Sequence, residues 1–333
     1  MRMTKILFSL LCLYCAHNAL DLDPKAQTTP EGRGENNGRQ TATPSALQIL
    51  VDNAARETVR KFAAKNFQEK NLAITVIDLA EAQFGRASFR GDVPIYPASV
   101  VKLFYLAAAH RWLEDKKISP SAELDRAMHD MIVDSSNEAT HYVLDCLTET
   151  TSGPELPAAE MNAWRERRNA VNRYFAALGY EKINVNQKPW CEGPYGRDRI
   201  FVGEKYTNRN MLTTDATARL LADIVTNRSI TAARSRAMME LLKRDPEGKR
   251  DDPDDQSHGF TGLALGRNEP GARLWSKAGW TSTTRHDAAY IETPDGLRFI
   301  IVTFTTEFSN ERDIIPTVAR RVIDGLRRAR TAK

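Results

Sequence analysis

The 333-residue sequence predicts an α+β fold, in which an α/β sandwich lobe with an antiparallel sheet carries an inserted all-α lobe. Three observations support this prediction. A strand-like apolar run occurs near residue 75, early in the chain. Similar runs return between residues 273 and 305, where turn residues separate them. The long stretch between these two regions is mostly helical in pattern.

The first elements of the sheet lobe follow one another closely. Residues 45–66 have apolar residues at helical spacing, 71–79 are typical of a strand, and 83–89 are expected to pair with it after a short turn. A second helix is expected to start at Pro97, because proline in a first helical turn loses no hydrogen bond. Residues 100–112 are mostly apolar, so this helix is predicted to be buried.

The helical pattern at residues 119–260 predicts the inserted lobe. Gly179 follows the third of its helices and suits a helix end. Residues 179–211 are irregular and polar, and residues 244–259 are charged with two prolines, which is typical of a solvated loop. The helices predicted in this lobe cover residues 121–133, 137–147, 160–178, 213–226 and 231–243.

The chain then returns to the sheet lobe, which is expected to comprise residues 45–118 and 261–333. A turn at Pro294-Asp295-Gly296 separates its last two strands. The sheet is therefore predicted to be built from both ends of the chain. The elements predicted here are strands at 273–278, 286–292 and 297–305 and a closing helix at 311–330.

The N-terminal residues look like a targeting segment. Residues 1–19 carry Arg2 and Lys5 ahead of an apolar run at 6–16, which is the pattern of a secretory signal peptide. The run is too short to span a bilayer comfortably. Residues 20–44 are polar, without hydrophobic periodicity, and predict a disordered linker. We expect a secreted or periplasmic protein without a stable membrane span.

The cysteines leave two questions open. Cys15 lies in the targeting segment, where lipidation is an alternative, but Tyr14 is bulky for the residue before a lipidated cysteine. Cys146 and Cys191 follow in the remaining chain. In an oxidising compartment they form either a disulfide or two separate core thiols, and the sequence does not decide between these arrangements.

Ser99 and Lys102 form the first candidate catalytic pair. Their spacing of three places both side chains on one face of the predicted helix, one turn apart. Burial disfavours an ammonium group, so a lysine in this apolar setting is able to accept a proton near neutral pH. A serine needs such a base to act as a nucleophile. The N-terminus of the helix also supplies N–H groups for a developing oxyanion.

Two later motifs complete a pattern. Ser135-Ser136-Asn137 lies between two predicted helices, and Lys277-Ala278-Gly279 lies on a predicted strand. With Ser99-x-x-Lys102, these stretches resemble the Ser-x-x-Lys, Ser-x-Asn and Lys-Thr-Gly motifs of penicillin-recognising serine enzymes. The chain is most similar to class A β-lactamases and their serine-hydrolase relatives, from about Ser45 onward. The resemblance implies the β-lactamase/transpeptidase-like fold.

The resemblance also implies roles for the residues of the second and third motifs. Ser135 would relay a proton to the leaving nitrogen, and Asn137 would bind Lys102 and a substrate amide. Ser135 or Ser136 is equally suited to cap the next helix. Lys277 would bind a substrate carboxylate and tune Ser135.

The third motif departs from the family pattern. Ala278 stands where a threonine or serine is usual, which puts affinity for penicillins in doubt. Gly279 would let the substrate approach the strand closely. The resemblance assigns the oxyanion-hole N–H groups to Ser99 and Thr281. Arg285 would supply a second cation for a carboxylate, unless it is a surface residue.

The deacylating base is not settled by the sequence. Class A β-lactamases use a loop glutamate followed four residues later by an asparagine. Glu204 and Asn208 have this spacing, whereas Glu192 lacks the asparagine. A third possibility is that neither glutamate takes this role, in which case the acyl-enzyme would persist.

Several functions therefore remain open. The first is a secreted β-lactamase that works through an acyl-Ser99 intermediate with Lys102 as base. The others are a D-Ala-D-Ala carboxypeptidase or penicillin-binding enzyme, and a sensing or wall-binding domain without turnover. The net charge of +4 argues against nucleic acid as a partner. The six histidines show no metal-ligand spacing, so we expect no metal or other cofactor, and we expect a monomer.

Overall fold

The computed structural model describes part of the chain, and the structural statements below concern that part. The predicted signal peptide and nearly all of the predicted linker lie outside the described residues. Cys191 lies outside them as well, so the structure does not test a disulfide between Cys146 and Cys191. Within the described residues, no helix combines the length and apolar character needed to cross a membrane. The described residues are 44–80, 84–190, 192–249 and 252–331.

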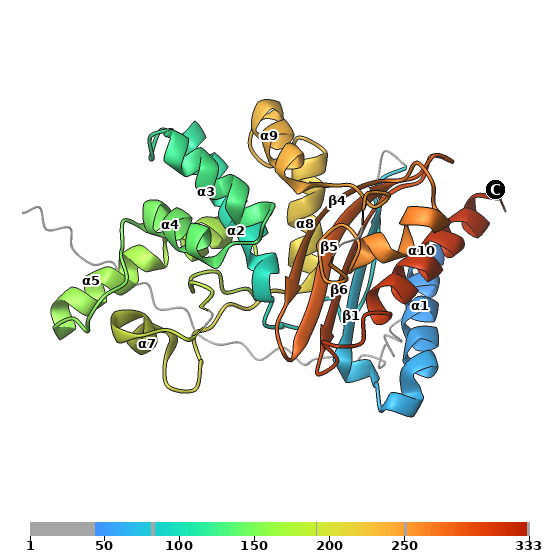
Figure 1. Ribbon diagram of the computed structural model, residues 1–333, viewed down its shortest axis with the longest axis horizontal. Helices are drawn as coiled ribbons and strands as arrows, with labels where there is room; N and C mark the ends of the chain where they lie inside the picture. Colours follow the sequence, from blue (N-terminus) through green and yellow to red (C-terminus); the bar gives the residue numbers. More distant parts are fainter. Residues whose placement is uncertain (1–43, 81–83, 191, 250–251, 332–333) are drawn as a thin grey trace, which may run out of the picture. The chain divides into compact units, whose positions relative to one another are not determined.

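One antiparallel sheet organises the molecule (Figure 1). Its strands are β1 (Leu72–Asp78), β2 (Gly85–Phe89), β3 (Lys243–Arg244), β4 (Arg273–Trp280), β5 (Thr284–Glu292) and β6 (Arg298–Thr306). Their order across the sheet is β2-β1-β6-β5-β4-β3. The early strand β1 pairs with the late strand β6 along its whole length. The predicted antiparallel sheet in an α+β fold, built from both ends of the chain, is thus confirmed.

Helices lie on both faces of the sheet, and most of them come from the part of the chain between β2 and β4 (Figure 1). Short 3₁₀ turns connect some of them, and the turn η3 (Ala98–Val101) leads directly into α2. The helices are α1 (Ala46–Phe62), α2 (Lys102–Glu114), α3 (Ala122–Ile132), α4 (Asn137–Thr148), α5 (Ala158–Arg168), α6 (Ala170–Ala177), α7 (Gly196–Val202), α8 (Thr214–Val225), α9 (Ala232–Leu242) and α10 (Ile314–Thr331).

The sheet has a buried core on each face. Along β1, Leu72, Ile74 and Val76 face α1 and α10, which lie side by side on one face (Figure 1). Ala73 and Ile77 belong to the core on the other face, where α8 packs against the sheet. Side chains alternate between faces along a strand, so strands that are apolar at successive positions need cover on both sides.

Helix α2 lies in the middle of the helical segment. It packs against α3, α4, α6 and α9, and nearly all of its residues are buried. Its leading turn η3 lies instead against β4 and β5. Ser99 therefore stands where the helical segment meets the sheet.

The helical segment differs from the sequence prediction in three places, one of which is the edge strand β3, found where the sequence predicts the end of a helix and a loop. The helix predicted at 160–178 is divided at Asn169, whose backbone leaves the helical conformation at ψ 9°. The Arg165 carbonyl oxygen accepts hydrogen bonds from both the backbone N–H and the side-chain Nδ2 of Asn169, each at 3.1 Å, so the side chain marks the end of α5. The stretch 179–211, predicted to be irregular, contains the short helix α7.

Candidate active site

The nucleophile segment, residues 96–102, contains a strained residue. Ala98 has a φ of 46°, in the left-handed region that residues with a Cβ rarely adopt. Ser99 follows it in η3, and Lys102 begins α2. The first N–H groups of a helix have no acceptor within that helix, which leaves the Ser99 N–H available to a ligand. Strain of this kind costs about 1–3 kcal/mol and is common at functional sites.

Gly279 of β4 permits this segment to lie against the sheet. A Cβ atom added at Gly279 would lie 2.6 Å from the Pro97 carbonyl oxygen and 2.9 Å from the Ser99 nitrogen. Both are backbone atoms, so no side-chain rotation relieves the clash. The sequence analysis expected Gly279 to let a substrate approach the strand closely. In the structure, the backbone that approaches Gly279 closely is that of the nucleophile segment.

Replacing Gly279 with alanine is therefore expected to push η3 away from β4. We expect a loss of stability of about 1–3 kcal/mol, typical of overpacking, together with slower acylation of Ser99. Chemical denaturation and the acylation rate measure the two effects. Gly85→Ala is the matched control, because the nearest contact of its added Cβ is a leucine methyl at 3.3 Å. Equal losses of stability and of acylation rate in the two variants would contradict the close packing of Gly279 against the nucleophile segment.

His286 of β5 holds the start of the same segment. Its Nε2 is 2.9 Å from the Tyr96 carbonyl oxygen, and its Nδ1 accepts a hydrogen bond from the Thr305 N–H at 3.1 Å. An Nδ1 that accepts requires the neutral ring with its proton on Nε2, which then donates to Tyr96. Burial lowers the pKa of His286 to about 4, so the ring is neutral at pH 7.

This burial makes stability depend on pH. The unfolded chain binds a proton at His286 below its ordinary pKa of 6.5, whereas the folded chain resists it down to about 4. The free energy of unfolding is therefore not reduced by His286 above pH 6.5, and it falls by up to about 3 kcal/mol as the pH falls toward 4. We expect His286→Gln to weaken this dependence in urea denaturation at a series of pH values. The exposed His129→Gln is the control, and an unchanged pH slope in His286→Gln would refute the assignment.

The Lys102 side chain points from α2 to the loop between α3 and α4. It is fully buried, and its Nζ donates to the Ser135 carbonyl oxygen at 2.5 Å and to Asn137 Oδ1 at 2.8 Å. The same Nζ lies 3.3 Å from Ser135 Oγ. The structure thus brings Lys102, Ser135 and Asn137 together.

The two serines of this loop divide their tasks. Ser136 caps α4, because its Oγ accepts the Ala139 N–H at 3.1 Å. Ser135 has a φ of 59°, and its Oγ contacts both lysines. The Lys102 Nζ binds the Ser135 carbonyl oxygen and so helps to hold this strained conformation.

Lys277 approaches Ser135 from the sheet. Its Nζ lies 2.9 Å from Ser135 Oγ and 2.8 Å from the Ala278 carbonyl oxygen, and the residue is fully buried. Burial, followed by the charges of Lys102 and Arg244, holds the pKa of Lys277 well below its ordinary value. Two lysine amines therefore share one serine hydroxyl, which lies within hydrogen-bonding reach of both.

Gln256, which is not among the residues that the sequence motifs indicate, also binds Lys277. Its Oε1 accepts from Lys277 Nζ at 2.8 Å and from the Ala278 N–H at 3.1 Å. Its Nε2 donates to the carbonyl oxygens of Ile132 and Val133. Gln256 therefore links the end of α3 to β4 beside the candidate site. It belongs to the charged loop that was predicted to be solvated, and no motif marks it.

The structure does not turn the Thr281 N–H toward Ser99. That group donates to the Thr284 carbonyl oxygen at 3.0 Å in the turn between β4 and β5. N–H directions alternate along a strand, and the Ala278 N–H points away from β5 to Gln256. Two residues later, the N–H of Trp280 points the same way. Trp280 replaces Thr281 as the candidate second oxyanion donor.

Arg285 is also placed elsewhere than the sequence suggested. It has the same strand parity as Ala289 and Ile291, which face α10, so it lies on the opposite face of the sheet from Lys277. Its Nη2 donates to the Gly259 carbonyl oxygen at 2.6 Å and pairs with Asp254 at 2.9 Å. The residue is 1% exposed, so its guanidinium is committed within the protein.

Glu204 lies in an exposed turn after α7. Within the described part of the chain it makes no hydrogen bond or ion pair, and Glu192 is exposed as well. Asn208 is turned inward, where its Oδ1 accepts hydrogen bonds from Asn184 and Asn186. The Glu–Asn spacing in the sequence is thus part of a loop whose asparagine is structural.

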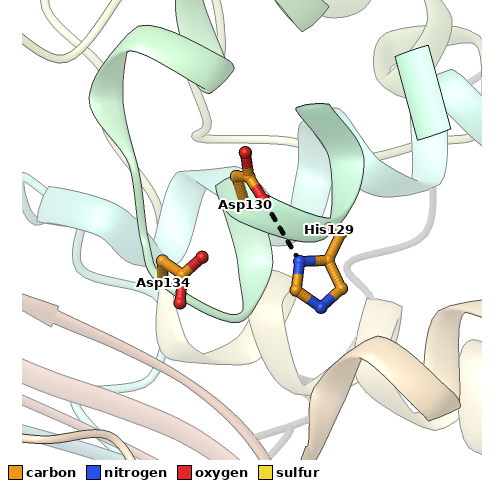
Figure 2. A group of neighbouring side chains, drawn as sticks. All are labelled: His129, Asp130 and Asp134. Atoms are coloured by element: carbon orange, nitrogen blue, oxygen red, sulfur yellow. Dashed lines mark hydrogen bonds and ion pairs between the residues drawn. The ribbon is translucent and has the colours of Figure 1, made fainter. Parts of the chain in front are cut away.

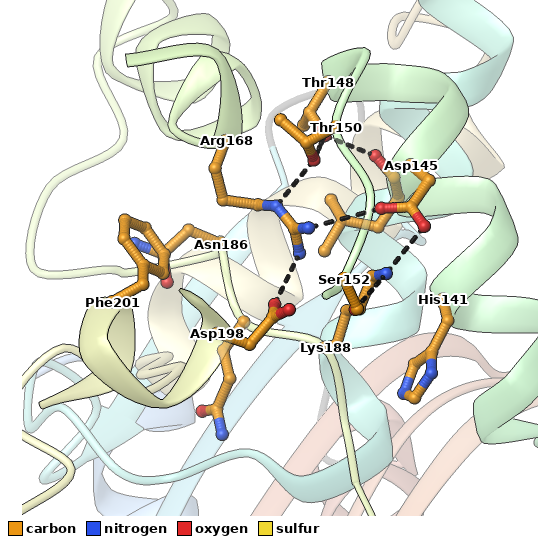
Figure 3. A network of polar contacts seen from close by, with 12 residues as sticks. His141, Asp145, Thr148, Thr150, Ser152, Arg168, Asn186, Lys188, Asp198 and Phe201 are labelled. Carbon is orange, nitrogen blue, oxygen red and sulfur yellow. Dashed lines mark hydrogen bonds and ion pairs between the residues drawn. The ribbon is translucent and has the colours of Figure 1, made fainter. Parts of the chain in front are cut away.

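A largely buried charge network anchors the segment 179–211, which contains this turn (Figure 3). Lys188 Nζ lies 2.6 Å from Asp145 Oδ2, and Arg168 joins Asp145 at 3.2 Å to Asp198 at 3.3 Å. These groups come from α4, α5, α7 and the loop itself. Breaking one buried partner leaves the other charge uncompensated, so the network fixes the loop strongly.

One group of side chains has its ligand atoms close enough to hold a metal ion (Figure 2). His129, Asp130 and Asp134 lie just before Ser135, with ligand atoms within 4.8 Å of one another. Asp130 is already paired with Arg126 at 3.2 Å, which opposes a further cation. His129 and Asp134 are exposed. We assign no metal to this surface group.

Comparison with known proteins identifies the family. Residues 54–326, most of the chain, match the family described as "Beta-lactamase enzyme family". The chain belongs to this family. The membership confirms the resemblance drawn from the three motifs and supports a serine β-lactamase-like hydrolase. No curated protein matches the chain.

Solved structures of β-lactamases and of PBP-A share the fold. A β-lactamase from Sphaerobacter thermophilus is 19% identical with a TM-score of 0.58, covering 82% of this chain and 96% of that one. PBP-A is 16% identical with a TM-score of 0.57, covering 83% and 96%. A class A β-lactamase representing the last common ancestor of Gram-negative bacteria is 17% identical with a TM-score of 0.56, covering 85% and 100%.

Proposed function

We propose that this member of the β-lactamase family is a serine hydrolase that opens the β-lactam amide through an acyl-Ser99 intermediate. One observation carries the proposal. Lys102, one turn after Ser99, and Lys277, from the sheet, both reach the Ser135 hydroxyl, at 3.3 and 2.9 Å. A nucleophile, a base and a relay for the leaving group are then present together.

The proposed acylation has a balanced proton path. Ser99 Oγ attacks the β-lactam carbonyl carbon and gives its proton to neutral Lys102. The N–H groups of Ser99 and Trp280 stabilise the oxyanion. When the C–N bond breaks, the nitrogen takes a proton from Ser135 Oγ, and Lys102 returns its proton to Ser135. Water then hydrolyses the ester and restores Ser99.

A second function differs in the fate of the ester. PBP-A has the same fold, and the structure of a PBP-A mutant is an acyl-enzyme complex with penicillin G. In this chain the candidate deacylating residue, Glu204, is exposed in a turn without a hydrogen bond to any described residue. This favours slow deacylation, as in a penicillin-binding enzyme, a D-Ala-D-Ala carboxypeptidase or a sensor that is acylated once.

Pre-steady-state kinetics with a chromogenic cephalosporin tests the proposal. A burst followed by steady turnover supports the β-lactamase. A burst of one equivalent followed by no turnover, with a lasting adduct in the intact mass, supports the penicillin-binding alternative. Absence of both burst and adduct would contradict acylation of Ser99 by β-lactams.

We also propose that the protein acts outside the cytoplasm as a monomer. The support is the charged and apolar pattern of residues 1–19, together with a substrate class found at the cell wall. N-terminal sequencing of the exported protein would show removal of about 16 to 19 residues if this is right. An uncleaved cytoplasmic protein would contradict it. Sedimentation of the purified protein tests the monomer.

A further inference from the structure

The Lys277 side chain has no hydrogen-bond donor left for a ligand. An ammonium group has three N–H donors. Those of Lys277 have three acceptors at 2.8–2.9 Å, namely Ser135 Oγ, Gln256 Oε1 and the Ala278 carbonyl oxygen. Lys277 is also fully buried. A substrate carboxylate can bind this amine only if one of the three acceptors leaves.

Gln256 is the acceptor able to leave. The Ala278 carbonyl belongs to the strand itself, and Ser135 is held by its loop and by Lys102. Gln256 is a partly exposed side chain in the connection before β4. Its departure would vacate one position that faces both Lys277 Nζ and the Ala278 N–H, at 2.8 and 3.1 Å from the present Oε1.

Those two donors suit a carboxylate oxygen. One is a cation and the other is a backbone N–H, and charge-assisted hydrogen bonds of this kind are the strong ones. The neutral amide oxygen of Gln256 occupies the position now. Ala278 has no hydroxyl to offer a carboxylate, and its methyl group packs against Phe260 and Ile315.

We propose that Gln256 is a specificity-determining residue, whose amide oxygen fills the carboxylate position beside Lys277 and so selects substrates that are uncharged there. The inference rests on the proposed function. The wild-type enzyme should gain little from a substrate carboxylate, since binding it requires displacing Gln256 from four hydrogen bonds, two of them to Ile132 and Val133.

The test compares one penicillin as its free acid and as its methyl ester. The ratio of their acylation efficiencies, kcat/KM or the second-order rate constant, isolates the carboxylate contribution. We expect Gln256→Ala to raise the acid-to-ester ratio about tenfold or more, because a charged hydrogen bond becomes available. Gln256→Glu should lower the ratio, since its own carboxylate would bind Lys277 and repel the substrate.

Two controls keep the test decisive. Ser257→Ala alters the same loop without touching Lys277 and should leave the ratio unchanged. Thermal denaturation shows whether each variant is folded, and if Gln256→Ala is not, Gln256→Glu still tests the proposal. An unchanged ratio in the folded Gln256 variants overturns the inference while leaving the proposed function intact. Wild-type enzyme labelled by neither acid nor ester would overturn the proposed function itself.

Discussion

Replacing Ser99 with alanine is expected to abolish covalent labelling by a β-lactam while the protein remains folded. The substitution removes the atom proposed to form the ester. Ser99 is partly exposed, and its hydroxyl does not cap a helix, so little stability should be lost. Intact-mass spectrometry after incubation with excess penicillin measures the labelling directly.

The matched control for this prediction is Ser136→Ala. It removes a hydroxyl from the same site region, but that hydroxyl caps α4 and contacts neither lysine amine. The variant should lose about 1 kcal/mol of stability and keep its labelling. Undiminished labelling of Ser99→Ala would show that another residue is the nucleophile.

Removing the basic group of Lys102 is expected to have the second largest effect. A positioned general base contributes about 10²–10⁴-fold to rate, so Lys102→Met should slow acylation by that amount. Lys102→Arg is the more informative variant. Its guanidinium also reaches toward Ser135 but cannot deprotonate in a protein, so it cannot act as a base and should be nearly as slow.

Stopped-flow acylation of the Lys102 variants separates the chemical role from a structural one. Lys102 is fully buried and binds the Ser135 carbonyl, so each variant needs a denaturation curve beside its rate. A folded Lys102→Arg that acylates at the wild-type rate would show that Lys102 is not the general base.

The sequence predicted those parts of the site that lie within short motifs. Ser99 and Lys102 are three residues apart, so helix geometry alone relates them. The convergence of Ser135 and Lys277 on one point was implied by resemblance, since 142 residues separate them. Local patterns carry no information about such a distance. Family membership supplied it.

Strand register explains why the remaining predictions differ from the structure. Arg285 pairs with Trp280 across β4 and β5, and this register puts its side chain on the α10 face. A register shifted by one residue would have turned it toward Lys277. The direction of the Thr281 N–H depends on the turn between β4 and β5, where it donates to the Thr284 carbonyl oxygen. Neither can be read from composition or from strand propensity.

Gln256 shows a further limit of sequence reasoning. It lies in a charged loop with two prolines, which is typical of solvated chain. Its role depends on side-chain contacts at both ends, with the carbonyls of Ile132 and Val133 and with Lys277. The division of the predicted 160–178 helix at Asn169 is likewise a local side-chain feature, since the Asn169 Nδ2 donates to the Arg165 carbonyl oxygen where α5 ends.

The most direct test of the central claim is peptide mapping of the wild-type protein after reaction with a penicillin. Opening of the β-lactam by an enzyme serine adds the whole mass of the drug. The account predicts this increment on the peptide that contains Ser99, and none on the peptide that contains Ser135. An increment on any other residue, or reaction without a Ser99 adduct at any time point, would contradict it.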